Sequence, residues 1–164
     1  MAGATEVWQR GAVPGYDPWV MPLVHALLQA AEDIDMLAAQ VPEAHVWQTP
    51  GGAASIGFHV RHMGGALDRL FTYARGEQLS EAQKQFARSE TEPGAPLIEV
   101  VAEAHRAIDS ALAQLRTTSA DTLLTARGVG RAQLPSTTLG LLMHAAEHCT
   151  RHVGQAVTTA KVLS

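Results

Sequence analysis

The sequence has few charged residues, with no surplus of basic ones, and a single cysteine, and each of these shortages excludes a class of protein. Its 164 residues hold 12 Lys and Arg against 16 Asp and Glu, with no cluster of basic residues. Nucleic acid is therefore not expected as a partner, because binding to phosphates relies on clustered Lys and Arg. Cys149 cannot form an internal disulfide, so the fold does not depend on an oxidising compartment.

Long apolar runs and targeting signals are also lacking. The most apolar stretch, residues 139–162, is interrupted by Glu147, Arg151 and three histidines. A helix needs about 20 predominantly apolar residues to cross a bilayer, so no membrane partner is expected. The first ten residues lack the basic and apolar regions of a secretory signal. These observations favour a cytoplasmic protein.

Apolar residues recur every three or four positions in four segments, which is the spacing of amphipathic helices. The predicted helices cover about residues 19–40, 55–75, 96–115 and 137–161. Stretches rich in Pro and Gly separate them. With 46% hydrophobic residues the chain can bury one ordinary core. We expect an all-α four-helix bundle that forms one domain over residues 1–164.

The connection between the second and third helices indicates how they are arranged. It is about 20 residues long, more than a tight helical hairpin needs, and contains a capped turn at Ser80–Gln83. This length can run back along a helix of roughly 30 Å. We therefore predict that these two helices lie parallel, joined by a long crossover. A short hairpin near residues 125–134 is compatible with this class.

Eight histidines stand out, and five of them lie at helical spacing. His144, His148 and His152 occupy positions i, i+4 and i+8 of the fourth helix, beside its apolar strip, and Gln155 follows on the same side. His59 and His62 sit beside the stripe of the second helix. Two helices thus offer imidazoles at the edge of the core.

Neutral imidazole is a common ligand of zinc, nickel, copper and iron, and an i, i+4 pair can reach one ion. A third histidine from another helix would complete a three-nitrogen site. Three protein ligands leave a position for water or substrate, which is typical of a catalytic site. The alternative is a set of hydrogen-bonded histidines at the core boundary without metal. His25, His45 and His105 are expected at the surface.

The histidine motifs resemble the DinB-like superfamily, named for DNA-damage-inducible proteins. The resemblance lies in Ser55-Ile-Gly-Phe-His-Val-Arg-His62-Met and in His144-Ala-Ala-Glu-His148-Cys-Thr-Arg-His152-Val-Gly-Gln155. The length of the chain and Trp47 are also similar to that family. Members often read His-Arg-Gly-Gln where this chain has Val after His152. The resemblance implies an up-down-down-up bundle and a homodimer.

It also implies a divalent metal, most often zinc or nickel, held by His62, His148 and His152. His144 is an alternative ligand or a support for one. Characterised relatives include S-transferases and isomerases that use low-molecular-weight thiols, and other members are described as metal-dependent hydrolases. A thiol co-substrate and a small-molecule substrate are therefore implied.

The leading hypothesis is an enzyme whose metal activates a water or a thiol, as a hydrolase or a thiol S-transferase. His59 is the candidate for proton transfer or for support of a ligand. Glu147 lies about 100° from the face of the ligands and is interpreted as a solvated residue. Trp47 and Tyr73 would wall a pocket or simply belong to the core.

Two other classes remain open. The first is a non-catalytic metal-binding or dimerisation bundle, in which a fourth protein ligand closes the coordination sphere. The second is a bundle that binds a small molecule and uses the histidines only as polar lining. The second class predicts a stability that does not change on chelation.

Overall fold

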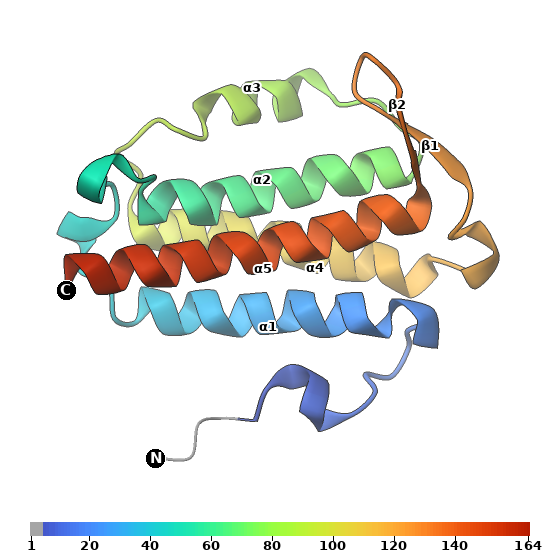
Figure 1. Cartoon of the computed structure of the whole chain (residues 1–164), viewed down its shortest axis with the longest axis horizontal. Coiled ribbons are helices and arrows are strands. Elements are labelled where there is room, and N and C mark those ends of the chain that lie inside the picture. The colour runs from blue at the N-terminus through green and yellow to red at the C-terminus, as the bar shows by residue number, and fades with distance from the viewer. Residues whose placement is uncertain (1–4) are drawn as a thin grey trace.

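Residues 5–164, the part of the chain that the computed structural model describes, fold into five α-helices and a two-stranded hairpin (Figure 1). The elements are α1 (Met21–Ala38), α2 (Ile56–Ala74), α3 (Glu81–Ser89), α4 (Leu97–Thr117), β1 (Ala126–Val129), β2 (Leu134–Thr137) and α5 (Thr138–Leu163). Helices α1, α2, α4 and α5 begin and end within about two residues of the predicted bounds, the usual uncertainty at helix ends.

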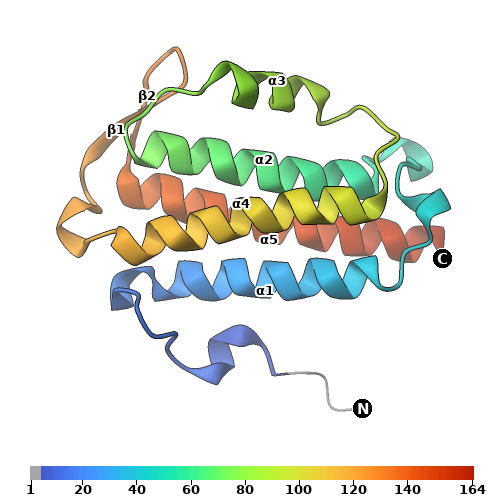
Figure 2. The same ribbon diagram turned by 180° about the vertical axis from the view of Figure 1, so that it is seen from behind.

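The four long helices form an up-down-down-up bundle, as predicted. Helix α2 packs against α5 and α4, and α1 packs against the same two helices from the other side. Figures 1 and 2 show that α2 and α4 run in one direction, whereas α1 and α5 run in the opposite direction. The two faces of α5 are therefore covered by α2 and by α1.

The crossover between α2 and α4 runs back along α2, as its length predicted (Figure 2). It contains a nine-residue helix, α3, where the sequence indicated only a capped turn. Ser80 and Gln83 form the capping box that starts α3. The Gln83 side chain also donates to Asp68 Oδ2 and Thr72 Oγ1 of α2, each at 2.8 Å. The crossover is thus fastened to the helix that it covers.

Local signals explain where the helices of the site begin and end. The Ser55 hydroxyl accepts a hydrogen bond from Phe58 N at the start of α2. Gly76, with φ of 82°, follows the end of α2 in the left-handed conformation that favours glycine. Thr137 caps α5 by accepting from Gly140 N. These caps fix where α2 and α5 begin and where α2 ends.

Strands β1 and β2 pair antiparallel just before α5, so the hairpin left open by the sequence is present. Arg127 Nε donates to Ala74 O at 2.7 Å and ties the hairpin to the end of α2. The core is one cluster of buried side chains from all four long helices. No helix within residues 5–164 is both long and apolar enough to cross a membrane.

Candidate metal centre

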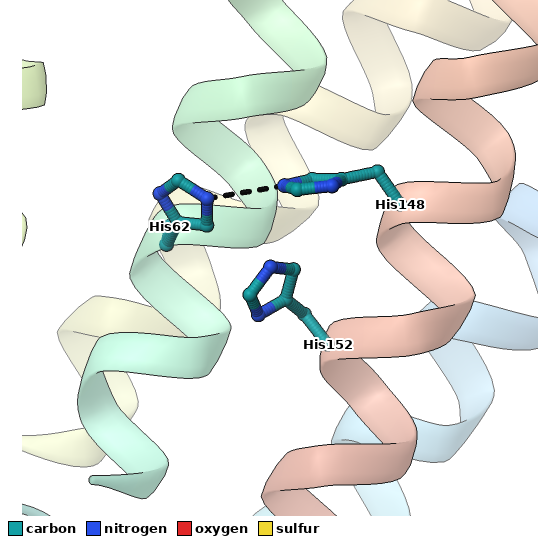
Figure 3. Close-up of side chains that lie close together, drawn as sticks. All are labelled: His62, His148 and His152. Atoms are coloured by element: carbon teal, nitrogen blue, oxygen red, sulfur yellow. Dashed lines mark hydrogen bonds between the residues drawn. The ribbon is translucent and has the colours of Figure 1, made fainter. Parts of the chain in front are cut away.

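The imidazoles of His62, His148 and His152 converge between α2 and α5 (Figure 3). Each ring offers one nitrogen, and these nitrogens lie within 4.8 Å of one another. All three side chains are half-buried. The structure thus brings together the three histidines that were singled out as ligands.

Core packing next to the histidines sets this convergence. His62 is followed by Met63 and His148 by Cys149, and both following residues are fully buried. Cys149 Sγ lies 4.0 Å from Met63 O across the contact between α2 and α5. Because a buried contact fixes the register of two helices, the preceding histidines face each other at the edge of the same contact.

The buried carboxylate of Glu90 contacts His62 at Nδ1, the ring nitrogen that does not face His148. His62 Nδ1 lies 2.7 Å from Oε2 of Glu90, and Arg69 Nη1 donates to Oε1 of Glu90 at 2.5 Å. Burial would raise the pKa of Glu90, but the hydrogen bonds from His62 and Arg69 outweigh burial and keep this pKa below its usual range. An ionised carboxylate only accepts hydrogen bonds, so the proton of a neutral His62 sits on Nδ1. Its Nε2 lone pair then points towards α5.

The ring of His148 lies opposite the Nε2 lone pair of His62. Its Nε2 lies 3.0 Å from His62 Nε2 (Figure 3). Its Nδ1 is buried and has no hydrogen-bond partner among residues 5–164. Burial, followed by the repulsion that His62 and His144 exert when protonated, lowers the pKa of His148. The ring is neutral at pH 7, which is the form that binds metals.

His152 and His59 form a second pair beside the first. His59 is buried, and its Nδ1 lies 3.0 Å from Nδ1 of His152. Burial, reinforced by the charges of nearby histidines, lowers the pKa of His152 to about 4. The pKa of His59 is lowered by burial and by His62. Both rings are therefore neutral at pH 7.

The donor set fits a divalent ion of the zinc or nickel type. It consists of neutral imidazole nitrogens, which these borderline-soft metals prefer over hard oxygen donors. Buried polar atoms nearly always have a partner, and Nδ1 of His148 lacks one among the described residues. Hydrogen bonding of His62 to a carboxylate is also typical of a histidine that binds metal.

Other residues near the centre lie outside the three-histidine group. His144 is exposed, with Nδ1 3.5 Å from Glu147 Oε2 and its ring centroid 5.5 Å from that of His148. Glu147 accepts a hydrogen bond from Arg151 Nε at 2.8 Å and is not a member of the group. Burial raises the pKa of Cys149 to about 12, so its thiol is protonated and inert.

Three further histidines, which were expected at the surface and not as ligands, are not part of the centre. His25, His45 and His105 are all half-buried. His25 Nε2 lies 2.9 Å from Gly11 O, and His105 Nε2 lies 2.7 Å from Asp35 Oδ1 on α1.

The two aromatic residues considered for a pocket wall pack against the core. Trp47 Nε1 donates to Ala95 O at 2.8 Å, and the Arg61 guanidinium stacks over the indole ring. A side chain at Gly57 would collide with this indole. Tyr73 is half-buried against the core cluster. Both residues therefore belong to the packing around the core.

Sequence reasoning missed two residues of the centre. Glu90 lies at the end of α3, far along the chain from either histidine motif. Phe58 stacks on His62 with ring centroids 5.1 Å apart and an interplanar angle of 11°. The position of Phe58, four residues before His62, could have revealed it, because residues i and i+4 share one face of a helix. Glu90 had no comparable signal in its spacing.

Comparisons with known proteins agree with this architecture. A solved structure of a conserved protein from Enterococcus faecalis aligns with a TM-score of 0.70 at 14% identity, covering 87% of this chain and 95% of that one. This likeness shows a shared fold. None of the curated proteins matches the sequence. The family model of the DinB superfamily matches residues 26–156, which is more than half of the chain. The chain therefore belongs to the DinB superfamily.

Proposed function

We propose that this chain is a metal-dependent enzyme of the hydrolase or thiol S-transferase type. The observation that carries the proposal is the convergence of His62, His148 and His152 from two helices, with their ring nitrogens within 4.8 Å. These residues would hold one divalent ion, zinc or nickel. When bound, such an ion lowers the pKa of a water or a thiol and so provides a nucleophile at neutral pH.

The protein itself supplies the binding nitrogens of His148 and His152 in their neutral form. Burial keeps the pKa values of His148 and His152 low, so a metal does not have to compete with protons at pH 7. His59, hydrogen-bonded to His152, is the candidate for holding or moving a proton next to the centre. Cys149 is buried and protonated, so a thiol nucleophile would come from a co-substrate.

One observation favours a second candidate, a metal site without catalysis. Nδ1 of His59 lies within hydrogen-bond distance of Nδ1 of His152, so a fourth imidazole stands next to the three-histidine group. Four protein ligands close the coordination sphere of zinc and are typical of a structural site. The two candidates differ in whether a small thiol can reach the ion.

The test combines a spectroscopic assay with an activity assay. Untagged protein is loaded with Co²⁺ and titrated with a low-molecular-weight thiol, and the near-ultraviolet thiolate-to-cobalt absorption is recorded. A panel of thiols with electrophiles, and of esters and amides, is then assayed with and without metal.

We expect thiol-dependent absorption and metal-dependent turnover in the wild type, both lost in His148→Ala. A bound ion that no thiol reaches, with no metal-dependent turnover, would overturn the enzyme proposal in favour of the structural site.

A further inference from the structure

We infer that Glu90 is a positioning residue of the proposed metal centre. Its carboxylate, anchored by Arg69, holds His62 in the tautomer and orientation that present Nε2 to the ion. This inference rests on the proposed function, since it assumes that His62 is a ligand. Glu90 would act through His62 and not touch the metal or the substrate.

The contacts of Glu90 use both carboxylate oxygens. Oε2 lies 2.7 Å from His62 Nδ1, and Oε1 accepts from Arg69 Nη1 at 2.5 Å. Glu90 is only 4% exposed. A buried carboxylate is costly unless it is paired and hydrogen-bonded, so both partners are needed to keep it there.

The stability of α3 does not explain this placement. Glu90 is the C-cap of α3. A negative charge is unfavourable at a helix C-terminus, because the helix dipole already places partial negative charge there. The carboxylate instead faces α2. Hydrogen bonds attach the crossover to α2 both before and after Glu90 in the chain. Gln83 bonds to α2 before Glu90, and the carbonyl of Glu92 accepts from Arg61 after it.

Helix α2 leaves room for the carboxylate through a glycine. A Cβ at Gly65 would collide with Glu90 Oε1 and would lie 2.7 Å from Cε1 of Phe86. Gly65 is buried and lies inside α2, where glycine costs about 0.5–1 kcal/mol relative to alanine. The missing side chain lets the crossover approach α2 closely enough for Glu90 to reach His62.

Replacing Glu90 by glutamine should reverse the tautomer of His62. Arg69 only donates hydrogen bonds, so it would hold the amide oxygen of the new side chain. The amide NH₂ would then face His62 Nδ1 and require a lone pair there. The ring proton would move to Nε2, the nitrogen needed for the metal.

The first measurement uses metal-free protein and does not depend on activity. Nitrogen-15 NMR of the histidine rings reports which nitrogen carries the proton. We expect His62 to carry it on Nδ1 in the wild type and on Nε2 in Glu90→Gln. The matched control is Glu147→Gln, which removes an exposed carboxylate beside His148 in the sequence and should leave the His62 tautomer unchanged.

The second measurement is a Zn²⁺ titration of the same proteins. Loss of an outer partner of a ligand weakens metal binding by about 10–100-fold, and this is the effect that we expect for Glu90→Gln. Glu147→Gln should bind like the wild type. Glu90→Asp keeps the charge on a shorter side chain and should bind with intermediate affinity. It also serves as a second variant if Glu90→Gln folds poorly.

The outcomes separate this inference from the proposed function. An unchanged tautomer together with unchanged Zn²⁺ affinity in Glu90→Gln overturns the role of Glu90. If the wild type binds no metal, the proposed function fails, and with it the part of the inference that concerns the ion. A tautomer change would still support control of His62 by Glu90.

Discussion

Helix α5 lies between two neighbours, and its two contact zones differ in chemistry. The α2–α5 contact carries His62, His148 and His152, with Glu90 behind His62. Along the α1–α5 contact lie three mostly apolar hollows of about 590, 470 and 410 Å³. His25 lies there too, but its Nε2 is 2.9 Å from the carbonyl oxygen of Gly11.

This difference shows what a histidine needs in order to become a candidate ligand. Partial burial is not sufficient, because His25 is half-buried as well. The imidazoles of the α2–α5 contact converge from two helices, and one of them is held by a buried carboxylate from the crossover. At the α1–α5 contact the N-terminal segment covers one hollow with Trp8, and the nearby Glu6 of this segment accepts from Trp8 Nε1 instead of holding an imidazole.

The largest expected effect is on metal binding. His148→Ala removes a central nitrogen of the three-histidine group, so bound zinc or nickel should fall from about one ion per chain to nearly none. His25→Ala, the matched change at the α1–α5 contact, should leave the metal content unchanged. Elemental analysis of untagged proteins measures both. Equal metal content in the wild type and in His148→Ala would contradict the claim that the α2–α5 contact, and not the α1–α5 contact, binds the metal.

Shortening a buried side chain at the α1–α5 contact should lower the stability of the fold and leave metal binding unchanged. Leu23 is buried and lines one hollow together with Met143 and Ala146 of α5. Leu23→Ala should lower the free energy of unfolding by about 2–5 kcal/mol, because it leaves a cavity in the core. Urea denaturation measures this change, and a parallel zinc titration should show wild-type stoichiometry. Loss of metal from the folded variant would show that the two contacts are coupled.

Removing the metal should destabilise the protein to a smaller degree. Free metal at 100 times Kd stabilises a folded protein by about 2.7 kcal/mol. For a chain of this size that corresponds to a Tm decrease of roughly 5–10 °C after chelation. Thermal unfolding with and without a chelator tests this, with His148→Ala as the control that should not respond. An unchanged wild-type Tm would favour histidines that act only as polar lining.

Two glycines provide the smallest and most discriminating comparison. Gly65→Ala places a methyl group against Glu90 and should cost about 1–3 kcal/mol through overpacking, with weaker zinc binding. Gly154→Ala on α5 meets nothing within 4 Å and should stabilise the helix by about 0.5–1 kcal/mol. Denaturation curves measure both effects, and equal effects of the two changes would contradict the close approach of Glu90 to α2.

The bundle was predictable because local signals encode it, whereas the choice of His62, His148 and His152 among the helical histidines came from the resemblance to the DinB-like superfamily. Helical periodicity placed the apolar stripes, and Ser55 and Thr137 marked the starts of α2 and α5. The spacing of His148 and His152 put both rings on one face of α5. The length of the crossover predicted the parallel arrangement of α2 and α4.

The positions of Glu90, His59 and His144 relative to the three histidines depend on tertiary contacts. The spacing of residues in the sequence could not predict them. Glu90 reaches His62 only because α3 folds back over α2 at Gly65. The sequence did not distinguish His59 from His144 as neighbours of the ligands. In the structure His59 is buried against His152, whereas His144 is exposed, because the packing of α2 on α5 decides which turns meet.

The central claim is that the α2–α5 contact binds one divalent metal ion, and a titration tests it most directly. Untagged protein is stripped with a chelator, titrated with Zn²⁺ in a calorimeter and compared with the His62→Ala/His148→Ala double variant. The account predicts one ion per wild-type chain and no binding above background in the double variant. Absence of binding in the wild type, or the same binding in the double variant, would contradict it.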